Sequence, residues 1–228
     1  MRKSPPSLPH PETFGFDRSS EYENGFYLTA SVDRFSKFVS HLDLFRRSSG
    51  VSGEIVECGV FKGASLSRFI KFRALLENTM SRRIIAFDSF GYFPEADDED
   101  REKLAQFQSV GGEQGLSQAE LQCIFEELEL NTNVELIEGD VRSTVPGYCA
   151  RYPELRISLL NIDVDHYEAT AVCLNNFYPH VTPGGIILLD DYGAFPGASR
   201  AIDEFFSDLG LKIEKLPYAF SHAFVEKP

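Results

Sequence analysis

The sequence has no long apolar run and no paired cysteines. A membrane span needs about 20 predominantly apolar residues, and no such run occurs in the 228 residues. The first twelve residues contain four prolines and no apolar core of a secretory signal. The four cysteines stand singly. We therefore expect no membrane partner and a cytoplasmic protein with reduced thiols, and we interpret Cys58 as a small core residue rather than a nucleophile.

Basic residues are also scarce. Lys and Arg number 22 against 35 Asp and Glu, so the formal net charge is −13 at pH 7. A surface with this charge repels a phosphate backbone. We therefore expect a small-molecule ligand and no nucleic acid partner. Assembly into a homo-oligomer is compatible with the sequence.

Residues 1–30 are expected to form an N-terminal arm or lid. The proline-rich and polar segment up to Asn24 shows neither a helical nor a strand period. Residues 31–228 then form a single domain, because no repeat or linker divides them. It begins with an amphipathic helix from Ser31 to Arg46, predicted by apolar residues at three- and four-residue spacing: Val32, Phe35, Phe38, Val39, Leu42 and Phe45.

The rest of the chain alternates short apolar runs with helical periods. Continuous apolar runs are typical of parallel strands buried on both faces, and their alternation with helices predicts a mostly parallel sheet with helices on both faces. The last two runs are too close for a crossover helix and are expected to pair antiparallel at an edge. We expect seven strands: Glu54–Val60, Arg83–Phe90, Val134–Asp140, Ile157–Asp165, Gly185–Tyr192, Leu211–Leu216 and His222–Val225. The acidic stretch from Pro94 to Glu102 is interpreted as a solvated loop or the start of a helix.

The first strand leads into a turn that contains two glycines, Gly59 and Gly63, followed by a helix. Glycines at the carboxyl end of a parallel strand let the backbone approach a ligand closely. The pattern is not the dinucleotide motif G-x-G-x-x-G, which disfavours a nicotinamide-linked oxidoreductase. Glu57 precedes the first glycine and favours a cationic ligand group over a pyrophosphate.

Asp88 ends the second strand, 25 residues after Gly63. An acid at about 20 residues from such a turn reaches ribose hydroxyls in nucleotide-binding α/β folds. An adenosine that carries a positive charge fits both features, and S-adenosylmethionine is such a molecule. Gly139 and Asp140, after the third strand, are expected to border the adenine, although Asp140 is equally suited to cap the next helix.

Four carboxylates follow two further strands. Period-two alternation places Asp163 and Asp165 on one side, and Asp190 and Asp191 end the next strand. If the two strands are neighbours, Asp163, Asp190 and Asp191 converge, and no Lys or Arg occurs from Ile157 through Gly193. A hard divalent cation balances such a cluster. Alternatively, Asp163 or Asp165 caps the helix at Tyr167 and the Asp190–Asp191 pair is solvated. His166 is either a packing residue or a substrate contact.

The second half of the chain resembles the macrocin-type sugar O-methyltransferases. The resemblance rests on Ile162–Thr170, Tyr178–Gly185, Asp190–Gly193, Pro196–Gly197 and Ala201–Phe205, together with the earlier segments Gly53–Gly63 and Phe87–Phe90. It implies a class I, Rossmann-like methyltransferase fold and transfer of a methyl group from S-adenosylmethionine to a sugar hydroxyl, with Mg²⁺. The chain departs from the common Asp-Gly-Asp pattern of the family at Val164 and His166, which adjoin the acceptor.

The resemblance also implies roles for single residues. The metal ligands are Asp163, Asp190 and Asp191, and the general base is Asp165. The expected cofactor contacts are Glu57, Gly59, Gly63, Asp88, Ser89, Gly139, Asp140 and Asp163. A catechol-like or other diol acceptor would suit the same metal site, and a non-catalytic nucleotide-binding module is the alternative from another class.

Overall fold

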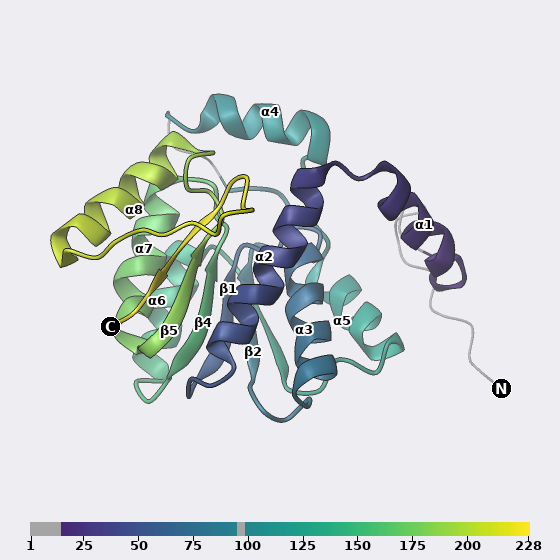
Figure 1. The fold of residues 1–228 in the computed structure, drawn as a ribbon, viewed down its shortest axis with the longest axis horizontal. Helices are drawn as coiled ribbons and strands as arrows, with labels where there is room; N and C mark the ends of the chain where they lie inside the picture. The colour runs from purple at the N-terminus through teal and green to yellow at the C-terminus, as the bar shows by residue number, and fades with distance from the viewer. Residues whose placement is uncertain (1–14, 95–98) are drawn as a thin grey trace.

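The computed structural model describes residues 15–94 and 99–228, and its centre is a six-stranded sheet between two layers of helices (Figure 1). The strand order is β3-β2-β1-β4-β5-β6, and β6 is antiparallel to β5 whereas the other pairs are parallel. The strands are β1 (Glu54–Cys58), β2 (Ile84–Asp88), β3 (Val134–Glu138), β4 (Ile157–Ile162), β5 (Val181–Leu189) and β6 (Ala223–Glu226). The predicted α/β class with an antiparallel edge strand is confirmed.

Helices cover both faces of the sheet. One face carries α2 (Val32–Ser48), α3 (Ala64–Leu76) and α5 (Gln118–Glu127), and the other carries α6 (Val141–Arg151), α7 (Tyr167–Phe177) and α8 (Pro196–Leu209). Figure 1 shows α4 (Arg101–Gly111) across the carboxyl ends of the strands and α1 (Ser19–Thr29) standing away from the two layers. Two short 3-10 helices cover Phe16–Arg18 and Tyr178–His180. None of the described helices is long and apolar enough to cross a membrane.

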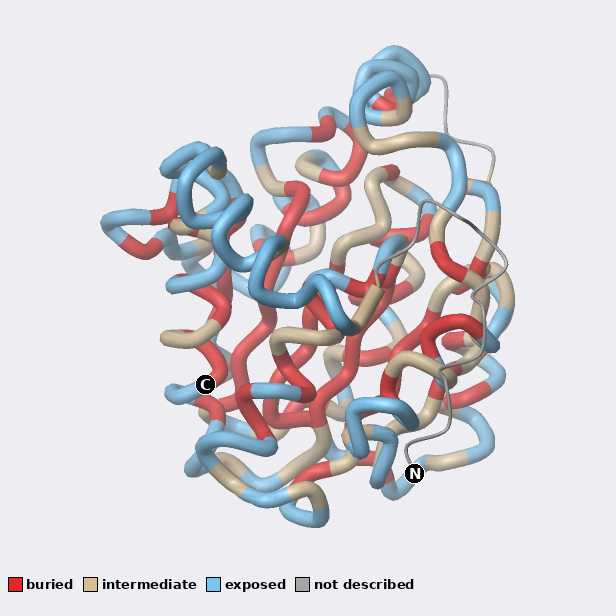
Figure 2. Tube along the Cα trace, turned by 90° about the vertical axis from the view of Figure 1, so that its right-hand side faces the viewer, coloured by how far each residue is buried: buried red, intermediate tan, exposed pale blue. Residues whose placement is uncertain are grey.

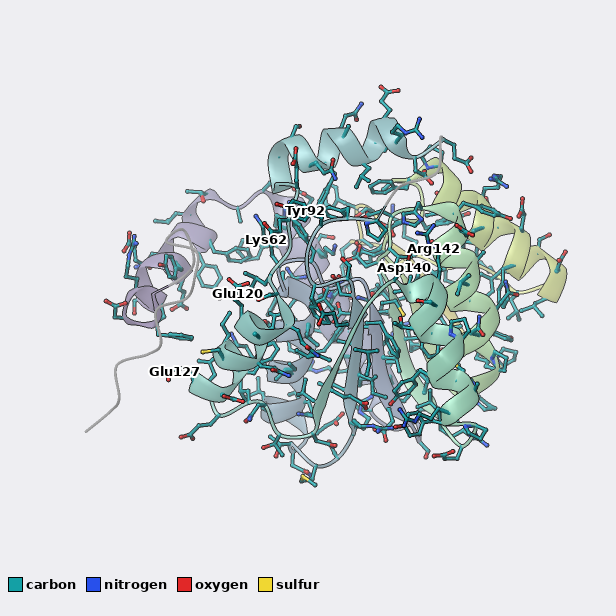
Figure 3. All side chains as sticks on the ribbon, turned by 180° about the vertical axis from the view of Figure 1, so that it is seen from behind. Lys62, Tyr92, Glu120, Glu127, Asp140 and Arg142 are labelled. Carbon is teal, nitrogen blue, oxygen red and sulfur yellow. The ribbon has the colours of Figure 1, made fainter. Side chains whose placement is uncertain are left out.

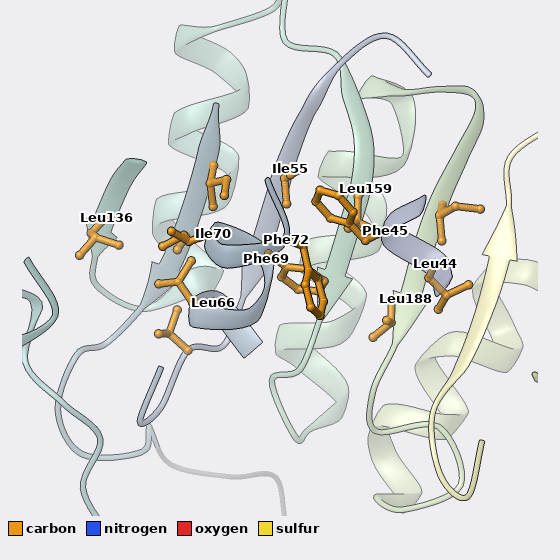
Figure 4. Close-up of a cluster of buried hydrophobic side chains, with 14 of the residues drawn as sticks. Leu44, Phe45, Ile55, Leu66, Phe69, Ile70, Phe72, Leu136, Leu159 and Leu188 are labelled. Carbon is orange, nitrogen blue, oxygen red and sulfur yellow. The ribbon is translucent and has the colours of Figure 1, made fainter. Parts of the chain in front are cut away.

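Two apolar cores hold the layers together, because successive strand residues point to opposite faces. Ile55 and Leu159 face the first core (Figure 4), where they meet Phe45 and Phe69. The next residues along the same strands, Val56 and Leu160, face the second core with α6, α7 and α8. All six residues of β4 are buried, and Figure 2 shows buried chain through the middle of the molecule.

The sheet has six strands in the described residues, so the prediction of seven is wrong by one. The segment from Leu211 to Leu216 alternates like a strand, but it meets β6 only at an isolated bridge between Glu214 and Phe224. Pro217 follows directly. Since proline cannot donate a ladder hydrogen bond, the pairing ends there.

The helix α2 confirms the predicted element, but only part of its expected apolar face is buried. Phe45 is buried and Leu42 packs against the first core, whereas Val32, Phe38 and Val39 are 72%, 39% and 43% exposed. The other buried residues of the helix are Ser36, Ser40, His41, Leu44 and Ser48. The Ser36 hydroxyl on this face donates to the Tyr218 carbonyl, and the Ser40 hydroxyl donates to the Ser36 carbonyl. Lys37, on the same helix, lines the cavity described below.

A helix at the N-terminus was not expected. The segment read as lacking a helical period forms α1 from Ser19, and α1 buries no residue. Part of the acidic stretch begins α4 at Arg101, while residues 95–98 lie outside the described residues. The same holds for residues 1–14 of the expected arm, so its role as a lid stays a prediction.

Candidate active site

A cavity of about 550 Å³ opens at the carboxyl ends of the strands, below α4. It lies where β1 and β4 are neighbours in the sheet. The chain leaves these two strands toward opposite faces, which is the point at which open α/β sheets bind ligands. Most of the residues singled out in the sequence line this cavity: Gly59, Asp88, Ser89, Gly139, Asp140, Asp163, Asp165, Asp190 and Asp191.

The turn after β1 requires glycine at two positions. Gly59 has φ 88°, and a Cβ there would lie 1.6 Å from the carbonyl oxygen of Asp163. Gly63 has φ 76° as the N-cap of α3, and its Cβ would lie 2.7 Å from Leu121 Cδ2. Gly59 thus lets two strand ends approach each other at the cavity. Gly63 does not line the cavity and instead sets the start of α3.

Glu57 lies buried beneath this turn. Its Oε1 accepts a hydrogen bond from Asn161 Nδ2 at 3.1 Å, and its Oε2 has no partner among the described residues. Burial, assisted by the charge of Asp88, raises the pKa of Glu57 to about 7, although hydrogen bonding opposes this rise. A buried carboxyl oxygen without a donor is the kind of group that a ligand ammonium satisfies.

Asp88 organises the same turn from β2. Its Oδ2 accepts from the N–H groups of Val60 and Phe61 at 2.6 and 3.0 Å, and its Oδ1 accepts from Phe90 N at 2.6 Å. Ser89 donates to the carbonyl of Tyr92. The side chain of Asp88 therefore fixes the loops of two strands in addition to lining the cavity.

Asp140 lines the cavity and also caps α6. Its Oδ1 accepts from Arg142 N at 2.8 Å, and its Oδ2 lies 2.6 Å from Arg142 Nη2. Figure 3 shows the pair at the end of the sheet where Lys62 and Tyr92 also lie. Of the two roles considered for Asp140, the helix cap is thus observed directly.

Three carboxylates lie together at the ends of β4 and β5. One oxygen each from Asp163, Asp165 and Asp191 lies within 4.8 Å of the others. Asp165 has φ 69°, and its N–H donates to Asp191 Oδ2 at 2.8 Å. Burial, and then repulsion from neighbouring carboxylates, raises the pKa of all three above the usual range of Asp. The positive charge near the cluster is therefore too small to offset burial and repulsion among the three carboxylates.

Asp190 differs from the other three because a lysine far away in the sequence neutralises it. Lys37 Nζ, on α2, lies 2.6 Å from Asp190 Oδ2 and 3.7 Å from Asp163 Oδ2. Burial opposes ionisation of Asp190, but the charge of Lys37 and the interactions with His41 together outweigh it and lower the pKa of Asp190. His41, one turn further along α2, places Nε2 3.8 Å from Asp190 Oδ1, and burial lowers its pKa to about 4.

Sequence reasoning missed Lys37 and His41. One signal was available: Lys37 and His41 lie one turn apart on the same side of a helix, a side that the apolar spacing leaves unexplained. The expected apolar face contained Phe38 and Val39 but neither Lys37 nor His41.

The N-terminus of α7 is satisfied by Asp100. The N–H of Tyr167 donates to Asp100 Oδ2 at 3.3 Å, and the N–H of Gly197 at the start of α8 donates to Oδ1 at 2.8 Å. The alternative in which Asp163 or Asp165 caps this helix is therefore wrong. His166 is buried and lines the cavity, which leaves both of its proposed roles open.

The chain is similar to one family of known proteins. The family model of the macrocin O-methyltransferases (TylF) matches residues 32–215. The chain belongs to this family. The match covers the expected cofactor contacts after β1, β2 and β3 and the carboxylates after β4 and β5, so the resemblance predicted from the sequence is confirmed.

Within the aligned residues, curated relatives are about 30% identical to this family member. A tetracenomycin-C rhamnosyl 4'-O-methyltransferase of Streptomyces olivaceus is 30% identical over 148 residues, which are 64% of this chain and 55% of that protein. The mycinamicin III 3''-O-methyltransferase of Micromonospora griseorubida is 29% identical over 172 residues, 72% of this chain and 65% of that protein. The chain thus spans only part of the length of these relatives.

A solved structure of the calicheamicin methyltransferase CalS11 superposes with a TM-score of 0.74 and 28% identity, over 96% of this chain and 87% of that one. Its apo structure, described as a TDP-rhamnose 3'-O-methyltransferase, gives a TM-score of 0.66 and 26% identity. The fold of the family member described here is therefore that of a known methyltransferase.

Proposed function

We propose that the protein is an S-adenosylmethionine- and Mg²⁺-dependent O-methyltransferase that acts on a sugar hydroxyl. The observation that carries the proposal is the position of the clustered carboxylates beside the Gly59 turn. One cavity then has a place for a charged cofactor and, next to it, a place for a cation and an acceptor hydroxyl. Family membership supports the same chemistry.

The cofactor is proposed to lie over β1, β2 and β3. The unpartnered oxygen of Glu57 suits its ammonium group, and Gly59 leaves the space that close approach requires. Asp88 and Ser89 line the ribose side, with Gly139 and Asp140 at the adenine. Because Asp88 accepts hydrogen bonds from three backbone N–H groups, its carboxylate is held in one orientation at the cavity.

A divalent cation is proposed to bind Asp163, Asp190 and Asp191. Hard oxygen ligands suit Mg²⁺, and the raised pKa values of Asp163 and Asp191 indicate that the cluster gains from a positive charge. Asp190 Oδ1 has no hydrogen-bond partner among the described residues, so it can serve as a ligand while Oδ2 stays with Lys37. A cation bound there supplies a Lewis acid that lowers the pKa of an acceptor hydroxyl.

Asp165 is proposed as the general base. Its left-handed backbone and its N–H bond to Asp191 fix the residue beside the other carboxylates in the cavity wall, and burial raises its pKa toward the range in which a carboxylate accepts a proton. The carboxylate would take the hydroxyl proton and so prepare the acceptor oxygen for methylation, while the S–CH3 bond of S-adenosylmethionine would break and S-adenosylhomocysteine would leave. α4 and the aromatic rings of Phe61, Phe93 and Phe107, which contact one another and line the cavity, exclude water.

The acceptor is proposed to be a sugar or a sugar-bearing natural product. The relatives named above are described as methyltransferases of a rhamnosyl tetracenomycin and of a mycinamicin. A catechol-like diol would also place two neighbouring oxygens at the carboxylates, and a panel of acceptors separates these classes.

Calorimetry and an acceptor panel test the proposal. S-adenosylmethionine is expected to bind with a dissociation constant in the micromolar range, which corresponds to about 8 kcal/mol at 1 μM. With Mg²⁺, methyl transfer to rhamnosides but not to catechols is expected, and a chelator should abolish it. Binding of NAD without binding of S-adenosylmethionine would contradict the proposal, as would full activity in excess chelator.

A further inference from the structure

Among the described residues, four Lys and Arg side chains line the cavity: Arg34 and Lys37 on α2, Lys62 in the turn after β1, and Arg68 on α3. Three of them have a place in the structure that needs no ligand. Lys37 pairs with Asp190, and Arg34 and Lys62 are exposed to solvent. Arg68 is half-buried, so its charge needs a partner more than the others do.

Arg68 has no such partner within the protein. Its guanidinium forms no hydrogen bond or ion pair with another residue in the described ranges 15–94 and 99–228. Ala64, Ser65 and Arg68 share one side of α3 because they are three and four residues apart, and all three line the cavity. Since α3 starts at Gly63, directly after the β1 turn, this side of the helix faces the place proposed for the cofactor.

The nearest unsatisfied group of opposite charge is Glu57, at the end of β1. Burial lowers the pKa of Arg68, and the charges of Asp190 and Glu57 oppose that effect. Glu57 Oε2 has no hydrogen-bond partner among the described residues, and Glu57 and Arg68 do not pair with each other there. The same end of the sheet therefore offers a ligand one carboxyl oxygen and one guanidinium.

An amino acid matches this arrangement, since its ammonium and its carboxylate are attached to one carbon. A ligand whose ammonium lies at Glu57 places its carboxylate close by, and the paired N–H donors of a guanidinium fit a carboxylate. We propose that Arg68 binds the carboxylate of the cofactor's methionine part, so that Glu57 and Arg68 together hold both of its charges. This inference rests on the proposed function, because it takes S-adenosylmethionine to bind with its ammonium at Glu57.

The test measures binding without methyl transfer. Calorimetry compares three ligands on the full chain with Mg²⁺ present. S-adenosylhomocysteine carries both charges, its decarboxylated counterpart keeps only the ammonium, and methylthioadenosine carries neither. Because a hydrogen bond to a charged group is lost with the carboxylate, wild-type protein is expected to bind S-adenosylhomocysteine at least about tenfold more tightly than the decarboxylated ligand.

Arg68→Gln should weaken S-adenosylhomocysteine binding about tenfold or more. It should leave the decarboxylated ligand bound at least as tightly as before, since a cation near the ligand ammonium is removed. Glu57→Gln should instead weaken both ligands that carry an ammonium. Arg68→Lys keeps the charge without the paired donors and should fall between wild type and Arg68→Gln. Lys71→Gln, at an exposed position on α3 outside the cavity lining, is the matched control and should change nothing.

Methylthioadenosine reports whether the adenosine part of the site is intact, and its affinity should be the same in wild type and in every variant. Equal binding of S-adenosylhomocysteine and its decarboxylated counterpart by wild type would overturn the proposal. An Arg68→Gln variant that weakens all three ligands alike, or none of them, would overturn it as well. Failure of the proposed function gives a different signature, since wild-type protein would then bind none of the three ligands.

Discussion

Glu57 is a carboxyl group that folding removes from water while one of its oxygens stays without a partner among the described residues. Its pKa rises from 4.5 to about 7, mainly through burial. The folded state therefore binds this proton more tightly than the unfolded state does. By linkage, the contribution of Glu57 to stability is lost as the pH rises from about 4.5 to about 7, and the loss is on the order of 3 kcal/mol at 1.36 kcal/mol per pKa unit.

We predict that Glu57→Gln removes this pH dependence and weakens cofactor binding. Relative to wild type, the ligand-free variant should gain on the order of 3 kcal/mol in free energy of unfolding between pH 5 and pH 8, since its amide does not titrate. Its affinity for S-adenosylmethionine should fall at least tenfold, because an amide cannot balance an ammonium. Denaturant titrations and calorimetry measure the two effects. Glu54→Gln on the same strand should keep cofactor affinity, and an unchanged affinity in Glu57→Gln would remove Glu57 from the cofactor site.

Asp100 joins two elements beside the cavity through N–H groups at the starts of α7 and α8. We predict that Asp100→Ala lowers the free energy of unfolding by about 1–3 kcal/mol, since one buried and one partly buried donor lose their acceptor. Asp100→Asn should lose less, because one oxygen remains. Denaturant unfolding checks both, with the exposed Glu102→Ala as control, expected within about 0.5 kcal/mol of wild type. Equal stability of Asp100→Ala and Glu102→Ala would show that the two bonds contribute nothing.

The N-terminal element is expected to act on turnover rather than on folding. α1 buries no residue, so removal of residues 1–30 should leave the melting temperature nearly unchanged. If the segment orders over the bound acceptor, kcat should fall more than tenfold while the affinity for S-adenosylmethionine changes less than twofold. Steady-state kinetics and calorimetry on the truncated chain measure this. Unchanged kinetics would assign the segment another task, such as a contact between subunits.

The sequence predicted those elements whose signal is local. A buried parallel strand, a glycine turn and a carboxylate pair are each encoded within a few residues, which is why β1, Gly59 and the Asp190–Asp191 pair were recognised. The ion pair between Lys37 on α2 and Asp190, 153 residues away, was not recognised. The cap of α7 by Asp100 is equally non-local. Contacts between residues so far apart in the chain leave no periodic pattern in the sequence.

For the molecule as a whole, Asp163, Asp165 and Asp191 bring three carboxylates with raised pKa values together, and we propose that a bound cation balances their charge. We predict that Mg²⁺ raises the melting temperature, with about 2.7 kcal/mol of stabilisation when its concentration is 100 times the dissociation constant. Asp191→Asn should abolish this gain, and its metal-free form should be no less stable than metal-free wild type, because repulsion is relieved. Thermal unfolding with and without a chelator tests this. Asp208→Asn, at an exposed position on α8, should respond as wild type does.

A shift with Mg²⁺ that survives in Asp191→Asn would place the cation elsewhere on the protein. That result would leave the cofactor assignment untouched, since Glu57, Gly59 and Asp88 are tested by S-adenosylmethionine binding alone.

Magnesium titration of Asp165→Asn tests the central claim most directly, namely that three carboxylates hold a cation while Asp165 takes the proton. One oxygen of Asp165 lies within 4.8 Å of oxygens of Asp163 and Asp191, so the residue is placed either to act as the base or to bind the metal. A base predicts that the variant binds Mg²⁺ and S-adenosylmethionine as wild type does, yet turns over about 10²–10⁴ times more slowly at every Mg²⁺ concentration. A metal ligand predicts weaker Mg²⁺ binding and a rate that high Mg²⁺ restores. Rescue by Mg²⁺, or a rate near that of wild type, would contradict the account.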